Sequence, residues 1–134
     1  MNTKPIVITL IVTFVIVALM VFLTTVEKKG AVSEDDLASL ATCLTDSGAK
    51  FYGAFWCGHC QSQKRAFGDA ASLLPYIECS TEDGSGQLPI CEAAGITSYP
   101  SWEFADGSLL LGEISLSQLA EKAECDFVVS NSQE

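Results

Sequence analysis

Cys57 and Cys60, which enclose Gly58 and His59, are the residues best suited to chemistry. They follow an apolar, aromatic run at residues 51–56 and open a stretch with helical composition. Helical spacing of i and i+3 places both sulfurs on one face, so a disulfide between them can form with little backbone movement. We expect Cys57 at the helix N-terminus, where unpaired N–H groups and the helix dipole favour a thiolate. Cys60 is then the shielded, resolving thiol one turn inward.

His59 is the only histidine in the chain. Inside the motif it can hydrogen-bond to the Cys57 thiolate, or pair with it when protonated, and so make the disulfide more oxidising. The alternative is an exposed histidine without effect. We expect a reduction potential nearer to that of protein disulfide isomerase than to that of thioredoxin.

A metal site is the main chemical alternative for the motif. A closed zinc site needs four ligands, but the chain has one histidine and no second Cys-x-x-Cys. A haem c site needs a histidine directly after the second cysteine, where this chain has Gln61. We therefore expect no metal at the motif and no bound cofactor, because a dithiol carries the electrons itself. A purely structural Cys57–Cys60 bond is the remaining alternative.

The elements around the motif follow the order of a mixed α/β domain. Ser33 with Asp36, and Ser115 with Gln118, form capping boxes that begin the first and last helices. Asp106-Gly107 is a hairpin turn signal. A β-α-β unit that leads into a hairpin and a closing helix predicts a mixed sheet flanked by helices. The predicted helices cover residues 34–47, 57–67, 70–74, 90–94 and 116–123, and the predicted strands cover 51–56, 76–79, 101–104 and 108–112.

The N-terminal segment is strongly apolar. Residues 6–26 form a run of 21 residues without a charge, proline or glycine. As a helix this run is about 31 Å long, which matches a bilayer core. We expect a transmembrane anchor in residues 1–26, spanning 6–26, and the alternative is a cleaved signal peptide. A linker at 27–33, a domain at 34–127 and a flexible tail at 128–134 complete the predicted organisation.

Four further cysteines indicate the redox compartment, since persistent disulfides belong outside the cytosol. Cys79 and Cys91 are expected to form a structural disulfide, and the alternative is a second redox pair that relays electrons to Cys57. Cys43 and Cys125 can pair and join the terminal helices, or remain buried thiols. We expect a single-pass protein with a cytoplasmic N-terminus and an extracytoplasmic domain.

The charge of the chain excludes two classes of partner. Seventeen acidic and six basic residues follow residue 26, a formal charge of −11. Nucleic acid and anionic lipid are both bound mainly through positive charge. We therefore expect neither, and interpret the acidity as a source of solubility.

Aromatic residues beside the motif are candidates for substrate contact. We expect Trp56, Gly58 and Tyr99 to lie at the substrate surface, and Phe55 and Trp102 to fill the core. Lys64 and Arg65 are interpreted as a solvated helix face.

Two strings carry a family resemblance: residues 56–60 after the first strand, and Tyr99-Pro100 before the third. Over residues 34–127 the chain resembles the thioredoxin fold. Together with residues 48–55, 63–64, 67–68, 76–79, Cys91 and 101–102, these strings resemble the thioredoxin-like domain associated with bacterial vitamin K epoxide reductase homologues.

The resemblance implies thiol–disulfide exchange in which Cys57 attacks and Cys60 resolves. It also implies a cis Pro100 that faces the motif and leaves the Tyr99 backbone free to pair with a substrate strand. One departure concerns the buried aspartate that typical thioredoxins carry six residues before the first cysteine, where this chain has Phe51. Lys50 and Glu103 are candidate replacements.

These observations predict a membrane-anchored, extracytoplasmic thiol–disulfide oxidoreductase. It would oxidise protein thiols and be reoxidised by a quinone-linked membrane protein of the vitamin K epoxide reductase type. The alternatives are a reductase or isomerase fed by a transmembrane electron donor, and a non-enzymatic module that binds metal or a protein partner.

Overall fold

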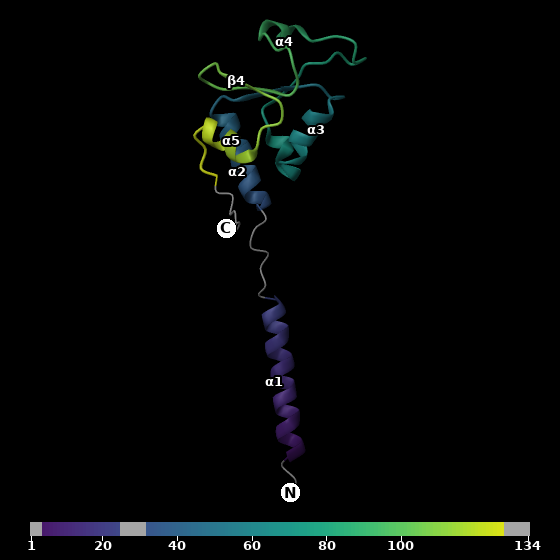
Figure 1. The fold of residues 1–134 in the computed structure, drawn as a ribbon, viewed down its shortest axis with the longest axis vertical. Helices are drawn as coiled ribbons and strands as arrows, with labels where there is room; N and C mark the ends of the chain where they lie inside the picture. The colour runs from purple at the N-terminus through teal and green to yellow at the C-terminus, as the bar shows by residue number, and fades with distance from the viewer. Residues whose placement is uncertain (1–3, 25–31, 128–134) are drawn as a thin grey trace. The chain divides into compact units, whose positions relative to one another are not determined.

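The computed structural model describes residues 4–24 and 32–127, and the chain divides into two units. One unit contains helix α1 (Lys4–Thr24) and the other contains all the remaining elements (Figure 1). Among the described residues, no helix meets the combined requirements of length and apolar character for crossing a membrane. The predicted span ends at residues 25 and 26, which lie outside the described residues, as do most of the predicted linker and the predicted tail.

A four-stranded mixed sheet organises the second unit, in the order β2-β1-β3-β4. β1 (Lys50–Gly53) runs parallel to β2 (Tyr76–Glu78) and antiparallel to β3 (Ser101–Glu103), which pairs in turn with β4 (Leu109–Leu111). This is the predicted β-α-β unit followed by a hairpin. The first strand is shorter than predicted, because the backbone leaves the sheet after Gly53.

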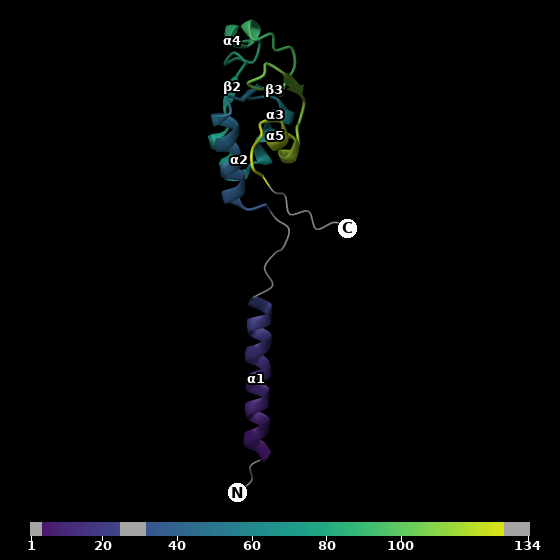
Figure 2. The same cartoon turned by 90° about the vertical axis from the view of Figure 1, so that its left-hand side faces the viewer.

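Helices cover the two faces of the sheet unequally. α2 (Glu34–Asp46), α3 (Gly58–Arg65) and α5 (Leu116–Lys122) lie on one side, and the short α4 (Pro89–Ala93) lies on the other (Figures 1 and 2). A 3-10 helix, η1 (Gly68–Leu73), follows α3 and packs against α2. It occupies the place of the predicted helical turn at 70–74.

Local sequence signals act at the helix ends as expected. The Ser33–Asp36 and Ser115–Gln118 capping boxes are both formed. Gly48 ends the first helix of the domain with a φ of +81°, a conformation in which glycine carries no steric penalty. The helix stripe predicted from the sequence is buried at Leu37, Leu40, Ala41 and Leu44.

The main core lies between the sheet and the three larger helices of the domain. It includes Phe51 and Trp102, whose rings stack with centroids 4.6 Å apart and an interplanar angle of 4°. The prediction that Trp102 fills the core is confirmed. Both motif cysteines belong to the same cluster, so the helix that carries them is anchored directly on the core.

Candidate active site

Cys57 is the N-cap residue of α3, as the sequence predicted. Its Sγ accepts a hydrogen bond from the Cys60 backbone N–H at 3.4 Å, and its own N–H donates to the Ala54 carbonyl at 3.0 Å. The first contact pairs one of the N–H groups that a helix leaves without a partner at its start. Cys57 is 8% exposed.

Cys60 lies beneath it and is only 1% exposed. Burial, together with a hydrogen bond to Cys57, raises the pKa of the Cys60 thiol to about 12. Both cysteines are free thiols in this structure. The pair therefore combines a sulfur at the helix N-cap with a more deeply buried one whose raised pKa keeps it protonated, which is the asymmetry expected of an attacking and a resolving cysteine.

The Tyr99–Pro100 segment faces Cys57 from the start of β3. Its peptide bond is cis, as the resemblance implied, and Pro100 is fully buried. The Cys57 thiol donates to the Tyr99 carbonyl at 3.7 Å. The Tyr99 ring is half-buried, and its hydroxyl accepts a hydrogen bond from Gln87 at 2.7 Å.

Two adjacent aromatic side chains beside the motif are exposed. Trp56 is 54% exposed, as predicted, and is held by a 2.8 Å hydrogen bond from its Nε1 to Ser80 and by an edge-on contact with Tyr99. The prediction that Phe55 fills the core is wrong, because this residue is 50% exposed. The strand ends at Gly53, so Phe55 lies in the turn before α3 and its side chain leaves the core.

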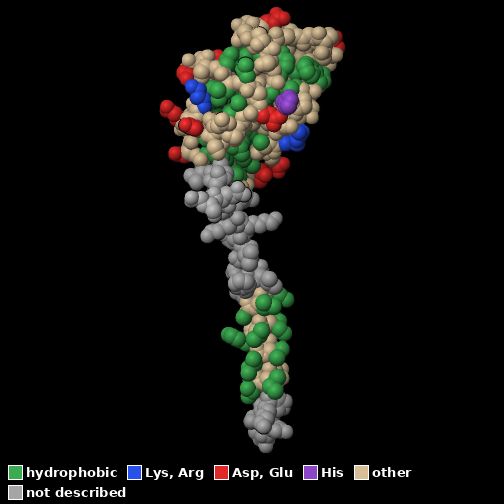
Figure 3. Space-filling view, in the orientation of Figure 1, with side chains coloured by type: hydrophobic (Ala, Val, Ile, Leu, Met, Phe, Trp, Pro, Cys, Tyr) green, Lys and Arg blue, Asp and Glu red, His purple; other side chains and the backbone are tan. Residues whose placement is uncertain are grey.

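His59 contacts an acidic residue that the sequence analysis did not identify. Its Nδ1 lies 2.6 Å from Glu113 Oε1, and both side chains are largely solvent-exposed. Figure 3 shows the chain's single histidine at the domain surface with acidic side chains beside it. The expected partner of His59 was the Cys57 sulfur. Glu113 is 54 residues away in the chain, and no local motif marks it.

Gln63 fixes the segment that carries Glu113. This side chain is 2% exposed and exchanges two hydrogen bonds with the Ile114 backbone, accepting from its N–H at 2.7 Å and donating to its carbonyl at 3.0 Å. A buried amide with both ends satisfied holds its partner segment firmly. The β4–α5 connection is thereby attached to α3 one turn beyond the motif.

The two candidate replacements for the missing aspartate bind each other. Lys50 Nζ lies 3.4 Å from Glu103 Oε2, which also accepts a 2.7 Å hydrogen bond from the Tyr52 hydroxyl. Burial and this carboxylate raise the pKa of Tyr52 to about 12. Glu103 is thus engaged by two partners on the strands, and the Phe51 position remains apolar.

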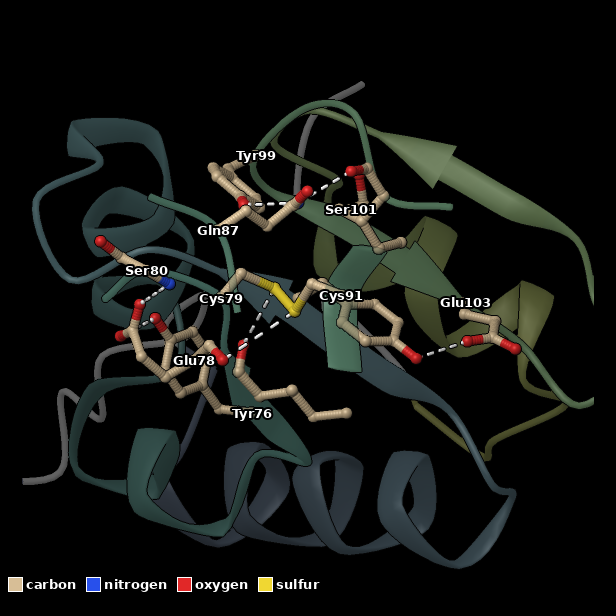
Figure 4. Close-up of a disulfide and its surroundings, with 12 residues drawn as sticks. Tyr76, Glu78, Cys79, Ser80, Gln87, Cys91, Tyr99, Ser101 and Glu103 are labelled. Carbon is tan, nitrogen blue, oxygen red and sulfur yellow. Dashed lines mark hydrogen bonds between the residues drawn. A yellow bond between two sulfur atoms is a disulfide. The ribbon is translucent and has the colours of Figure 1, made fainter. Parts of the chain in front are cut away.

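Both additional cysteine pairs form disulfides. Cys79–Cys91 joins the end of β2 to α4, and both residues are 0% exposed (Figure 4). Cys43–Cys125 joins α2 to the segment after α5 across 82 residues. The burial of Cys79 and Cys91 favours a structural role over the alternative of an electron relay, which requires an accessible sulfur.

The sheet order, the placement of the cysteine pair at the start of α3 and the cis proline opposite it define a thioredoxin-like domain. No family model matches the chain. Comparison with known proteins supports the assignment. An 87-residue stretch is 46% identical to the thiol-disulfide oxidoreductase LTO1 of Arabidopsis thaliana, covering 62% of this chain and 23% of that protein.

A 59-residue stretch is 36% identical to protein disulfide-isomerase A2 of Homo sapiens, covering 41% of this chain and 11% of that protein. The chain therefore matches about a quarter of the length of one relative and about a tenth of the other. Its thioredoxin-like domain is homologous to the corresponding parts of these oxidoreductases. Both relatives are named for thiol–disulfide chemistry, one as a thiol-disulfide oxidoreductase and the other as a protein disulfide-isomerase.

Proposed function

We propose that this protein exchanges disulfides with protein substrates through Cys57 and Cys60, and that its net direction is oxidation of the substrate. The observation that carries the proposal is the asymmetry of the pair, with Cys57 at the α3 N-cap and Cys60 buried under it. Its similarity to LTO1 and to protein disulfide-isomerase A2 supports the same chemistry.

The exchange proceeds in two balanced steps. A substrate thiolate attacks Cys57 of the oxidised pair, the Cys57–Cys60 bond breaks, and Cys60 leaves with the electron pair and takes up a proton. A second substrate thiolate then attacks the substrate sulfur of the mixed disulfide and releases Cys57. The substrate gains a disulfide and the protein pair gains two electrons.

The surface around Cys57 suits an extended polypeptide. Trp56 and Phe55 expose apolar rings beside the motif, and the Tyr99 carbonyl lies 3.7 Å from the Cys57 sulfur. An aromatic wall beside a backbone acceptor supports binding through strand-like hydrogen bonds. We infer that Trp56, Gly58 and Tyr99 contact the substrate.

Trapping and turnover together test this proposal. Cys60→Ala should accumulate mixed disulfides at Cys57, since the resolving thiol is absent, while Cys57→Ala should form none. The wild-type protein should refold a reduced, disulfide-containing substrate in the presence of an oxidant, and Cys57→Ala should not. Stoichiometric metal or peptide uptake without turnover would instead identify a binding module.

The direction of electron flow has its own measurement. Redox titration of the protein against glutathione should give a potential nearer to about −180 mV than to about −270 mV, the values of protein disulfide isomerase and thioredoxin. A value at or below the thioredoxin potential would favour the reductase alternative.

We further propose an extracytoplasmic location and a membrane-bound redox partner of the vitamin K epoxide reductase type. Two structural disulfides support an oxidising compartment. Attachment to the membrane is inferred from the apolar sequence of residues 6–26 alone. Labelling of Cys60→Ala in intact cells with a membrane-impermeant thiol reagent tests the location, and modification only after lysis would contradict it.

A further inference from the structure

The shielded thiol of Cys60 has a cationic neighbour on its own helix. Lys64 lies four residues after Cys60 in α3, and side chains at this spacing share one helix face. The sequence analysis placed Lys64 on a solvated face, but the structure shows it half-buried, whereas the adjacent Arg65 is exposed.

An aromatic ring fixes the position of Lys64. Its Nζ lies 3.2 Å from the centroid of the Tyr76 ring, a close cation–π contact. Tyr76 belongs to β2, so the contact joins the motif helix to the sheet directly below the cysteine pair. The Tyr76 ring also makes an edge-to-face contact with Phe51, with ring centroids 5.2 Å apart.

The Tyr76 ring and the Cys60 sulfur meet over Gly53. A Cβ on Gly53 would lie 2.8 Å from Tyr76 Cε2 and 2.9 Å from Cys60 Sγ, so these two atoms are less than 6 Å apart. The ring that holds the Lys64 ammonium therefore borders the buried sulfur. No side chain from Gly53 separates the two groups.

Tyr76 is fixed in this position and remains uncharged. Its hydroxyl donates to Glu78 Oε2 at 2.8 Å, while Glu78 Oε1 accepts from the backbone N–H groups of Ser80 and Phe55 (Figure 4). Burial, followed by the hydrogen bond and charge of Glu78, raises the pKa of Tyr76 well above its ordinary value. The ring thus presents a neutral aromatic face to Lys64 at any physiological pH.

The chemistry at Cys60 needs a positive charge. In both directions of exchange this sulfur becomes a thiolate, either as the group that leaves when the Cys57–Cys60 bond breaks or as the nucleophile that re-forms it. An unpaired anion in a desolvated site is strongly disfavoured. Burial has the largest influence and raises the pKa of Cys60, and the Cys57 sulfur raises it further. The Ala54 backbone lowers this pKa through a hydrogen bond, and Lys64 is the neighbouring charge that lowers it.

We propose that Lys64, held over the Tyr76 ring, is the positioned charge that stabilises the Cys60 thiolate during exchange. Tyr76 and Glu78 act as positioning residues for this ammonium. The inference rests on the proposed function, because it assigns a role within the Cys57–Cys60 exchange. The environment of the cysteine pair is apolar at Phe51, which stacks on Trp102 and supplies no charge.

Three other charged or titratable groups lie near the cysteine pair, but at positions different from that of Lys64. Glu78 faces the hydroxyl end of Tyr76, away from the ring face that Lys64 covers. His59 and Glu113 form their exposed pair at the start of α3. The effect of removing Lys64 on the pH dependence of Cys60 can therefore be compared with the separate effects of removing Glu78, His59 or Glu113.

The experiment measures the Cys60-dependent step alone. The full chain is prepared with Cys57 in a mixed disulfide with glutathione, and the release of glutathione by Cys60 is followed between pH 7 and 12, because the pKa of Cys60 lies at about 12. Lys64→Gln and Lys64→Met should each move the midpoint of this profile up by about one pH unit, the lower end of the effect of a close opposite charge. At pH 7 the release should then be about tenfold slower.

Two controls make the result specific to Lys64. Lys64→Arg keeps the charge and should retain most of the wild-type profile. Arg65→Gln removes the same charge from the neighbouring exposed position, where the side chain bonds Ser62, and should leave the midpoint unchanged. An unchanged midpoint in Lys64→Gln would overturn the inference, as would the same shift in Arg65→Gln. Absence of glutathione release in the wild-type protein would instead overturn the proposed function.

Discussion

Replacing Gly53 with alanine tests the packing between the buried thiol and the sheet. Gly53 is the last residue of β1, and its carbonyl accepts a 2.8 Å hydrogen bond from the Cys79 N–H. Its φ does not lie in the left-handed region, so the alanine backbone is not strained. The effect of the substitution on the folded state therefore comes from contacts of the added methyl group.

The geometry sets the size of the effect. The new Cβ would lie 2.8 Å from the Tyr76 ring and 2.9 Å from Cys60 Sγ, well inside an ordinary contact of about 3.5–4.0 Å. Neither neighbour moves freely, because Tyr76 is bonded to Glu78 and Cys60 is on the first turn of α3. Overpacking of this kind costs about 1–3 kcal/mol, and the lower entropy of the unfolded alanine chain offsets about 0.5 kcal/mol of it. We expect a net loss of about 0.5–2.5 kcal/mol in the free energy of unfolding.

Urea denaturation of the reduced domain measures this loss, and Gly58→Ala is the matched control. Gly58 begins α3 and has no atom within 4 Å of an added Cβ. Alanine there should raise stability by up to about 1 kcal/mol through its helix propensity. Gly53→Ala should also slow oxidation of the dithiol by glutathione disulfide, since the Cys60 sulfur is displaced. A Gly53→Ala protein as stable as Gly58→Ala would refute this account of the packing.

Three further outcomes are expected. Replacing both Cys43 and Cys125 with serine should lower the free energy of unfolding by about 4.5 kcal/mol, since the bond closes a loop with a separation of 82 residues. Urea denaturation measures this change, and a loss under about 1 kcal/mol would contradict the chain-entropy estimate. Glu113→Gln should shift the reduction potential by less than about 20 mV, because exposed pairs contribute at most about 1 kcal/mol; a larger shift in a glutathione titration would show that the His59 contact tunes the cysteine pair. The raised pKa of Cys60, about 12 in the folded state against 9.0 for a free thiol, predicts that the reduced domain loses stability as the pH rises from about 9 to about 12. The unfolded chain releases that proton first, so this contribution to stability is fully present below pH 9. The oxidised domain lacks this thiol and should lose less stability between pH 8 and 11. Parallel curves of stability against pH for the two forms would argue against the pKa shift.

The sequence determined the local framework of the site. The capping box at Ser33 and the spacing of Cys57 and Cys60 depend on contacts between residues three or four positions apart, and such contacts can be read along the chain. The Asp106-Gly107 signal specifies its turn in the same way, with Gly107 at a φ of +76°. The β-α-β unit and the hairpin that follows it were predicted from these elements and from the short connections between them.

Family resemblance extended the prediction to a contact between distant segments. It predicted that Pro100 is cis and faces the motif, which the structure confirms through its neighbour Tyr99. Composition alone left the pairing of Cys43 with Cys125 open, because a separation of 82 residues carries no local signal.

Only the tertiary structure decided the environment of the two sulfurs. It placed Glu113 on His59, brought the Tyr76 ring under Lys64, and turned Phe55 out to solvent where the strand ended. Each of these depends on how far a strand extends or on which segments the sheet brings together. Burial and charge at a site are properties of neighbours in space, and for Cys60 the sheet supplies neighbours that no sequence spacing marks.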